Sequence, residues 1–580
     1  MSGERLRARL EHSHVSRRTL LKAGGVALAL GAVSPLLAAC GDEDDPVSTP
    51  GPGGATTATP DTGSTPAPSA PTAAGEDEAQ SGGTLTLGYT EPPTMDPRVS
   101  GATIAWRLFY NLFDPLIAMD FDTREYHPGL ASSWEVSEDG MIYAFSLRDG
   151  VMFHDGTPFT AEAVQYTFDS IMDPALLSLA AIGYLGPYDR SEVIDDTTVE
   201  VHFSEPYSPF LNNLTHSVLS PVSPTAAEAA GADFGQAPVG TGPFKFKEWQ
   251  PQISMTFERN PDYAWPLGVY RHEGPAYIDE IVVAFIPEET TRFGTLESGE
   301  SLVVDGVQPQ EVERLQADEN YQILLPAVPG SPQILPLNAD VEPTSDLLLR
   351  QAILYAVDMD TIIDTLWYGT RKAAQGPLSS PSWGYNPAVE EMYPYDQAKA
   401  EELLEEAGWV MGSGDVRQKD GNDLMLEYIT TTGIQGQAGE LVQAYLARVG
   451  IGVNLHQLEY AATAAAYLAS EHHIARIYFS HVDPVVLSTL YHSRNIPGTN
   501  FNRTMKVDPA LDEMLDNAAS ELDQDARIQQ YMDIQQYIMD QALMIPLWEE
   551  TVFWGAHASV KGIHFQPLGG IWFYDTWIEE

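Results

Sequence analysis

A 40-residue tract near the start of the chain limits what this sequence can fold into. Residues 41–80 contain no Lys, Arg or aromatic residue, and Val47 is the only larger aliphatic residue among Pro, Gly, Thr, Ser, Ala and acidic residues. Such a tract cannot bury enough apolar surface to offset the entropy lost on ordering. The sequence therefore predicts a disordered acidic linker over residues 40–82 and a folded part that begins near Gly82.

The folded part is about 500 residues long, which exceeds a single hydrophobic core, so we expect at least two lobes. Strand-like patterns at 84–88, 143–148 and 277–286, and later at 424–429, 451–457 and 474–479, alternate with amphipathic helical segments. Thr160, Asp396 and Asp508 stand where helix N-caps are expected. This alternation predicts the α/β fold class.

Cys40 is the single cysteine, so intramolecular disulfides and cysteine-rich metal sites are excluded. SRRTLLK, residues 16–22, resembles the twin-arginine export motif, and LAAC, which ends at Cys40, resembles a lipobox. The resemblance implies a signal peptide over residues 1–39, cleavage before Cys40 and acylation of its sulfur. The mature chain would then be a lipoprotein anchored to the outer face of the cytoplasmic membrane. The alternative is an uncleaved anchor, but the uncharged run 23–39 is shorter than the roughly 20 residues that a spanning helix needs.

The formal net charge of −52 makes nucleic acid a very poor partner for this chain. It also opposes adhesion to anionic lipid, so a lipid on Cys40 would have to provide the anchoring. The excess of acidic residues favours solubility outside the cell, and we interpret it mainly as solvated surface.

Two short motifs contain the ingredients of a hydrolase. FHDGTPF holds His154 and Asp155, but Asp-Gly followed by Thr-Pro is typical of a turn, and adjacent side chains diverge in an extended chain. FSHVDP holds Ser480, His481 and Asp483, where Ser480 and His481 would point to opposite faces of a strand. The sequence contains no HExxH motif and no phosphate-binding loop. We therefore expect no catalytic residues, no metal site and no cofactor.

Five segments, in order and at matching spacing, resemble one family. They are FHDGTPFTAEAVQYTFDSI, VGTGPFKFKEWQ, DLLLRQAILYAVDMDTIIDTLWYG, YPYDQAKAEELLEEAGW and NFNRTMKVDPALDEMLDNA. Over roughly residues 83–580 the chain resembles the family 5 extracellular solute-binding proteins of ABC importers, a group with oligopeptide-, dipeptide- and nickel-binding members.

The resemblance implies a two-lobed periplasmic-binding-protein-like fold of type II, in its large family 5 form. Lobe one would be discontinuous, over 83–328 plus 548–580, and lobe two would cover 329–547. Hinge strands would cross near VPGSPQILPLN and ALMIPLW. A solute that contacts both lobes would favour the closed state, and the transmembrane permease subunits would recognise that state.

The resemblance also implies where the solute is bound. The expected ligand-binding residues lie in the VSGATIAW loop, on the hinge-side strand, in the SPSWGYNP loop and after two strands of lobe two: Ser100, Trp106, Gln333, Asn338, Trp383, Tyr385, Gln435, His481 and Asp483. Trp383 is the strongest of these, because an aromatic side chain in a Ser/Pro/Gly loop often faces a ligand.

The chain departs from the peptide-binding members of that family at two places. IYFSHVDP lacks the carboxylate that those members place shortly before Asp-Pro, and TTTGIQGQAGE offers Gln435 and Gln437 where dipeptide binders present a cation. A buried charged terminus without its partner costs several kcal/mol, so zwitterionic dipeptides are expected to bind weakly. The leading interpretation is a receptor for a peptide or another polar organic solute. A metal-chelate receptor that uses His481, a glycan receptor that uses Trp383, a secreted hydrolase and a surface chaperone or sensor remain alternatives.

Overall fold

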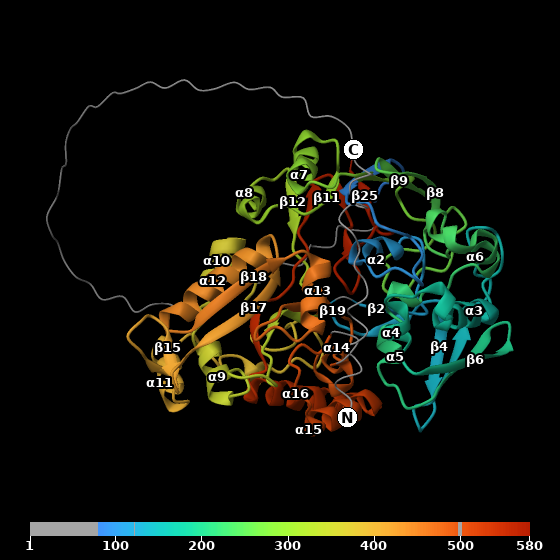
Figure 1. The fold of residues 1–580 in the computed structure, drawn as a ribbon. Coiled ribbons are helices and arrows are strands. Elements are labelled where there is room, and N and C mark those ends of the chain that lie inside the picture. Colours follow the sequence, from blue (N-terminus) through green and yellow to red (C-terminus); the bar gives the residue numbers. More distant parts are fainter. Residues whose placement is uncertain (1–78, 121, 497–500, 580) are drawn as a thin grey trace, which may run out of the picture. The chain divides into compact units, whose positions relative to one another are not determined.

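The computed structural model describes residues 79–120, 122–496 and 501–579 (Figure 1). The predicted signal peptide at 1–39, the lipidation of Cys40 and nearly all of the predicted linker lie outside the described residues. In the described ranges, no helix combines the length and apolar character needed to cross a bilayer.

A seven-stranded mixed sheet organises the first part of the chain. Its central strand β1 (Thr84–Tyr89) runs parallel to β10 (Glu280–Phe285) and to β11 (Val303–Asp305), and the other neighbours are antiparallel. The strand order is β12-β21-β11-β1-β10-β9-β8, with β8 (Phe244–Gln250), β9 (Ser254–Arg259), β12 (Tyr321–Leu324) and β21 (Trp554–His557) as the remaining members. Because β21 lies between β12 and β11, the C-terminal segment completes a sheet that the N-terminal half begins.

A four-stranded antiparallel sheet and several helices extend this part of the molecule. The sheet has the order β4-β5-β7-β6, and α3 (Ala161–Met172) packs on β6 and β7 through Val164, Phe168 and Ile171. The other elements are β4 (Ala131–Val136), β5 (Ile142–Leu147), β6 (Tyr188–Asp195), β7 (Thr198–Phe203), α2 (Thr103–Phe109), α4 (Ala181–Leu185), α5 (Phe210–Asn213), α6 (Pro224–Ala230), α7 (Glu289–Ser298) and α8 (Val312–Gln316). Most of their buried side chains belong to the first core, which draws on residues 85–328 and 552–574 and includes Val482. The buried apolar side chains of α7 and α8 form a smaller separate cluster with Val304, Val307 and Phe553.

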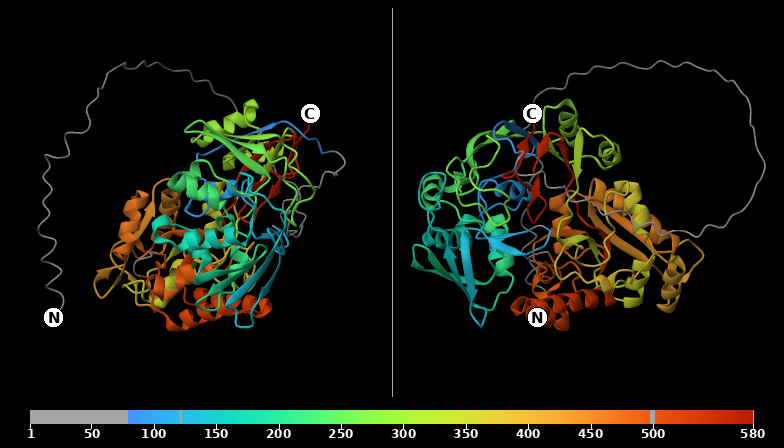
Figure 2. Two further views of the ribbon diagram at one scale, coloured as in Figure 1. Left: turned by 90° about the vertical axis from the view of Figure 1, so that its right-hand side faces the viewer. Right: turned by 180° about the vertical axis from the view of Figure 1, so that it is seen from behind.

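A separate hydrophobic cluster, the second core, draws on residues 334–548. Within it, β17 (Met425–Thr431) and β18 (Gly452–Leu458) pair in parallel, and α12 (Ile434–Arg448) connects them and packs against both. Helices α15 and α16 lie side by side in the views of Figures 1 and 2. The helices of this part are α9 (Leu347–Tyr355), α10 (Met359–Trp367), α11 (Gln397–Glu406), α13 (Tyr460–Leu468), α14 (Val486–Tyr491), α15 (Pro509–Ser520) and α16 (Gln524–Asp540).

The chain crosses between the two cores along two antiparallel segments. β12 pairs with β21, Ala327 then bridges Thr551, and β13 (Gly330–Pro336) next pairs with β20 (Met544–Trp548). β13 also pairs with β19 (Ile477–Ser480), which gives a three-stranded sheet of order β19-β13-β20. These crossing segments include the places where hinge strands were expected.

The remaining strands are short. They are β2 (Ile117–Met119), β3 (Tyr126–Pro128), β14 (Val410–Met411), β15 (Arg417–Lys419), β16 (Asn422–Asp423), β22 (Val560–Lys561), β23 (His564–Phe565), β24 (Ile571–Trp572) and β25 (Trp577–Ile578).

The helix starts follow the sequence signals, with one correction. Asp396 and Asp508 accept hydrogen bonds from the backbone N–H of Lys399 and Leu511 and cap α11 and α15 as predicted. Helix α3 begins at Ala161, directly after Thr160, but the Thr160 side chain makes no capping bond. The favourable interaction of Glu162 with the helix dipole remains at that end.

Candidate functional site

A cavity of about 520 Å³ lies beside the chain crossings. Both cores contribute to its wall. From the first part of the chain come Arg107 on α2 and the loop after β11, and from the second come the end of α10 with Arg371 and the start of α12. The second crossing segment, Glu550 to Phe553, completes the lining. The volume falls within the range of about 300–1,000 Å³ that is typical of small-molecule sites.

Glu550 is the centre of a charged network in this wall. Its carboxylate accepts hydrogen bonds from Arg371 and from the Gln333 side chain, the latter at 2.5 Å. The oxygen of the Gln333 amide accepts in turn from Arg476 Nε at 2.8 Å. Burial raises the pKa of Glu550, but Arg371, Gln333 and Arg476 outweigh this and hold it below its ordinary value. Glu550 is therefore ionised and already paired.

Arg371 lies with its guanidinium over two aromatic rings. Its guanidinium carbon lies 3.9 Å from the ring centroid of Trp367 and 5.3 Å from that of Phe553, and its side chain is 8% exposed. Arg107, also in the cavity lining, lies 3.7 Å from a carboxylate oxygen of Asp305, beyond hydrogen-bond distance. Tyr478 is near both arginines: burial and Glu550 raise its pKa, and the charges of Arg107 and Arg371 oppose that rise.

A second cluster joins the first core to the loop after β19. His481 stacks on Tyr184 with ring centroids 4.5 Å apart, Tyr184 contacts His216 at 4.5 Å, and Trp106 meets His216 edge-on at 5.0 Å. Trp106 Nε1 donates to the carbonyl of Ser100 at 3.1 Å. Burial lowers the pKa of His481 to about 4 and holds that of His216 well below its ordinary value, so both imidazoles are neutral at pH 7.

Asp483 is buried beneath this cluster and is fully engaged. Its carboxylate pairs with Arg527 at 2.8 Å, accepts from the side chain of Asn212 at 2.9 Å and accepts from the backbone N–H of Val485 at 2.8 Å. The Asn212 amide also donates to the carbonyl of Val482 at 2.9 Å. Asp483 thus connects α5 of the first part with α16 of the second.

The other predicted ligand residues do not converge on one point. Gln435 follows the cavity-lining Ile434 on α12. Trp383 packs on Arg527, at 4.8 Å, and the Tyr385 hydroxyl donates to Glu390 at 2.9 Å. Asn338 is completely buried and its amide donates to the carbonyl of His472 at 2.9 Å. The structure therefore places Gln333 beside the lining residue Glu550 and Gln435 beside the lining residue Ile434, although neither glutamine lines the cavity itself. It brings Ser100, Trp106 and His481 to the second cluster.

The histidine of the FHDGTPF motif serves the fold. His154 Nδ1 accepts from the backbone N–H of Gly240, and Nε2 donates to the carbonyl of Gly242 at 3.0 Å. Burial lowers the pKa of His154 to about 4. The neighbouring Asp155 accepts hydrogen bonds from Thr157 and Ser223. The residues belong to a turn, as predicted, and His154 does not contact Asp155 through a hydrogen bond in the described network.

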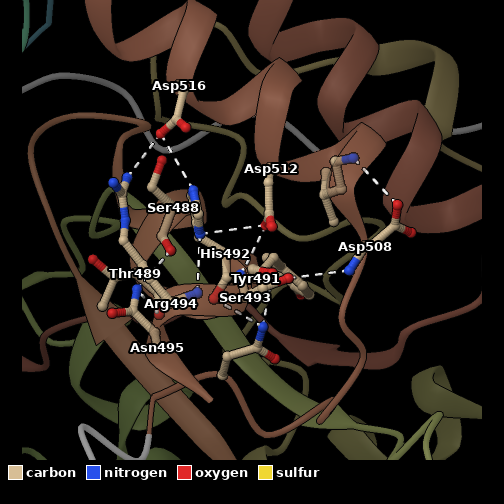
Figure 3. A network of polar contacts seen from close by, with 12 residues as sticks. Ser488, Thr489, Tyr491, His492, Ser493, Arg494, Asn495, Asp508, Asp512 and Asp516 are labelled. Atoms are coloured by element: carbon tan, nitrogen blue, oxygen red, sulfur yellow. Dashed lines mark hydrogen bonds and ion pairs between the residues drawn. The ribbon is translucent and has the colours of Figure 1, made fainter. Parts of the chain in front are cut away.

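Two further clusters of His and acidic side chains are explained by local ion pairing. Figure 3 shows the first, in which His492 lies 3.3 Å from both Asp512 and Asp516, and Arg494 donates to Asp516 at 3.0 Å. These contacts tie the short turn 493–495 to α15. The second cluster consists of Glu192 on β6 and of Glu200 and His202 on β7, whose side-chain ligand atoms lie within 4.8 Å of one another. Arg190 pairs with Glu192 and neutralises part of the negative charge of this cluster.

Sequence patterns did not predict the charged residues of the cavity wall. Arg107, Asp305, Arg371 and Glu550 come from four segments that lie far apart in the sequence. One signal was available: the chain has only 30 basic residues against 82 acidic ones, and Arg107 stands alone on the apolar helix TIAWRLF. A charge in such a setting indicates a buried partner or a ligand.

Comparisons with known proteins agree with this architecture. Residues 125–497 match the model of the bacterial extracellular solute-binding proteins, family 5. The glutathione-binding protein GsiB of Pectobacterium atrosepticum is 27% identical over 489 residues, which cover 82% of this chain and 90% of the relative.

Solved structures give the same result. DppA of Helicobacter pylori, in complex with the peptide STSA, superposes with a TM-score of 0.71 at 28% identity, covering 87% of this chain and 100% of DppA. NikA of Brucella suis, in complex with Fe(III)-EDTA, gives 0.76 at 27% identity, with 86% and 100% covered.

The chain therefore belongs to family 5 of the bacterial extracellular solute-binding proteins, and it has the two-lobed α/β fold of that family. It is an extracytoplasmic solute-binding receptor of an ABC importer. Members of the family are transport receptors and not enzymes, and they work with the membrane permease of the importer.

Proposed function

We propose that this receptor captures a peptide or another polar organic solute in the 520 Å³ cavity and delivers it to the transmembrane permease subunits. The observation that carries the proposal is the convergence of both cores on this one cavity at the chain crossings. A solute that contacts Arg107 from one side and Arg371 from the other stabilises the state in which the two sides are close. The permease would then recognise that state.

The proposed lobes follow the cores. Lobe one spans 83–328 plus 548–580, and lobe two spans 329–547. The first core draws on 85–328 and 552–574 and the second on 334–548, which supports these boundaries. The antiparallel crossing segments at 327 and 551 would act as the hinge, because closure needs backbone rotation at only a few positions there.

The solute class is argued from the relatives and from the wall of the cavity. GsiB is a glutathione-binding protein, and DppA and NikA are seen in complex with the peptide STSA and with Fe(III)-EDTA, so these relatives share polar solutes of moderate size. Asp483 is neutralised by Arg527, which supports the expectation that a peptide amino terminus is not bound there in the usual way. Free dipeptides should bind weakly, and tight dipeptide binding by calorimetry would contradict this.

A metal-chelate receptor and a glycan receptor are weaker candidates. His481 is stacked on Tyr184 outside the cavity lining, so it offers little to a chelate in the cavity. Trp383 covers Arg527 rather than the cavity, which removes the main support for glycan stacking. We also propose that the chain has no hydrolytic activity, since His154 is half-buried, His481 is buried and each is committed to backbone partners.

We further propose that Cys40 carries the lipid anchor after removal of residues 1–39. The proposal rests on the sequence pattern and on the family's exported location. A Cys40→Ala variant should leave the membrane fraction while its affinity for solute stays the same. Loss of affinity together with release would contradict a purely tethering role.

Native mass spectrometry of the gently purified full-length protein tests the central proposal. We expect one solute bound per chain, lost on partial unfolding and regained on refolding with the released fraction. Incubation of the released solute with fresh protein should return it chemically unchanged. A change in its mass would support the hydrolase alternative, and a bound metal ion would support the chelate alternative.

A further inference from the structure

The loop after β19, residues 481–485, reaches from lobe two into lobe one. Among the described residues between 329 and 547, Val482 is the one whose buried side chain belongs to the first core, and it is 4% exposed. The elements on either side of the loop, β19 and α14, instead contribute Ile477 and Val486 to the second core. The loop therefore places an apolar side chain of one lobe in the core of the other.

A buried amide of lobe one holds this loop. Asn212 on α5 is completely buried, and its side-chain N–H groups donate to the carbonyl of Val482 and to the carboxylate of Asp483, both at 2.9 Å. Arg527 of lobe two pairs with the same carboxylate at 2.8 Å, so the loop enters lobe one without an unpaired charge. Separation of the lobes here would break both hydrogen bonds of Asn212 and expose Val482 to water, which costs free energy.

The contact continues along the edges of both lobes. Ser208 of lobe one donates through its backbone N–H and through its hydroxyl to the carbonyl of Ala519 near the end of α15, both at 3.0 Å. Gly140, at the turn between β4 and β5, lies so close to Leu522 that a Cβ on it would be 3.0 Å from the Leu522 side chain. These contacts join protein atoms of one lobe directly to protein atoms of the other.

This contact is separate from the cavity and from the crossing segments. The described residues that line the cavity come from α2, the start of α7, the segment 305–310, the end of α10 with Arg371, the start of α12 and the second crossing segment. The two lobes are therefore connected twice, once by the chain itself at 327 and 551 and once by the loop 481–485 and its neighbours. The second connection is made by protein atoms alone.

We propose that residues 481–485 form a latch that holds the two lobes together through protein contacts alone, so that Asn212 and Val482 set the closed fraction of the receptor before a solute binds. The inference rests on the proposed lobes and hinge, and it adds to the solute a second determinant of closure. The apparent Kd for a solute that binds the closed state equals the intrinsic Kd divided by the closed fraction. A weaker latch therefore lowers the affinity without a change in any solute contact.

A distance between the lobes measures the latch directly. The full-length protein carries nitroxide labels at Leu179→Cys in lobe one and Leu468→Cys in lobe two, positions that are 75% and 55% exposed, with Cys40→Ala to leave no other thiol. Partial unfolding and refolding removes bound solute, and double electron–electron resonance then gives the distance distribution. We expect one dominant short distance, and Asn212→Ala and Val482→Ser should each raise the ratio of long-distance to short-distance molecules at least fivefold.

Asn502→Ala is the matched control. The Asn502 side chain is buried at 1% exposure and donates to the carbonyls of Tyr491 and His492, at 2.7 and 3.1 Å, so these bonds stay inside lobe two. The variant should lower the Tm and leave the distance distribution unchanged. An equal shift in this control would overturn the latch, because any loss of stability would then open the lobes.

Hydrogen exchange tests the same contact without a substitution, and it decides the matter where Asn212→Ala or Val482→Ser fails to fold. The Ser208 N–H donates across the contact, so it should exchange at least a hundredfold more slowly than a free amide, as resolved by mass spectrometry with electron-transfer fragmentation. Exchange at the rate of a free amide would overturn the latch.

Failure of the latch and failure of the proposed function give different results. A dominant long distance in the protein with an intact latch, or an unchanged ratio in folded Asn212→Ala and Val482→Ser, would overturn the latch while native mass spectrometry still shows a bound solute. Raised ratios in a protein that binds no solute would support the latch and overturn the proposed function.

Discussion

Replacement of Asp483 by Asn should destabilise the protein without removing its solute site. The substitution keeps the volume of the side chain and one oxygen, which can accept from Val485 or from Asn212 but not from both, because these donors bond different carboxylate oxygens of Asp483. It removes the negative charge that faces Arg527 at 2.8 Å, where both side chains are at most 6% exposed. The guanidinium of Arg527 is then left as a buried charge without a counterion.

The expected size of the effect follows from this burial. Breaking a buried ion pair by removing one partner typically costs about 3–5 kcal/mol. A cooperative unit of about 500 residues has an unfolding entropy of about 1 kcal/mol per kelvin, so the Tm should fall by about 3–5 °C. A double variant, Asp483→Asn with Arg527→Leu, should be less destabilised than the single one, because it removes the uncompensated charge.

Differential scanning calorimetry at pH 7 measures these shifts. The control is Asp516→Asn, which removes an exposed partner of Arg494 and should lower the Tm by less than about 1 °C. A Tm for Asp483→Asn within about 1 °C of the wild type would refute the structural role of this pair. Loss of solute binding at an unchanged Tm would instead make Asp483 a ligand residue.

Three further perturbations follow from buried groups. The pKa values of His154 and His481 are lowered to about 4, below the value of about 6.5 in the unfolded chain. The contribution of each histidine to stability is therefore complete above pH 6.5 and is lost towards pH 4, by about 3 kcal/mol per histidine. Urea unfolding across this pH range should show the loss, and His154→Gln should make it smaller. Burial raises the pKa of Asp114 to about 6, so its contribution to stability is complete below pH 4 and is lost as the pH rises through 6. The free energy of unfolding of Asp114→Asn should therefore rise by about 3 kcal/mol relative to that of the wild type between pH 4 and 6. A difference between the two proteins that does not change with pH would contradict this. Gly330 has φ +110° and its Cβ would lie 2.4 Å from the backbone nitrogen of His481, so Gly330→Ala should lower the Tm by several degrees, and a neutral effect would show that the crossing segment can shift.

The sequence was sufficient to predict most of the local structure. Strand alternation located β1, β5, β10, β17 and β18, and Asp396 and Asp508 capped the helices that follow them. These features are decided by neighbours a few residues away. Thr160 is the exception: it stands at the N-cap position of α3, but its side chain makes no capping hydrogen bond. A residue type that favours capping permits this bond and does not enforce it.

The site could be predicted only in part, because its contacts join distant segments. Gln333 meets Glu550 across 217 positions, and Asp483 meets Asn212 across 271. Periodicity and turn signals contain no information on such pairs. The family resemblance predicted which loops contact the solute, and it could not specify that Arg371 would lie over the Trp367 ring or that Asp483 would be paired with Arg527.

The central claim is that this receptor holds its solute in the cavity between Arg107 and Arg371. A crystal structure of the full-length protein, purified gently enough to retain its solute, tests that claim most directly. We predict density for one polar organic molecule in this cavity, in contact with the Arg107 and Arg371 side chains. Density for the solute elsewhere, for example beside His481 and Tyr184, would contradict the claim.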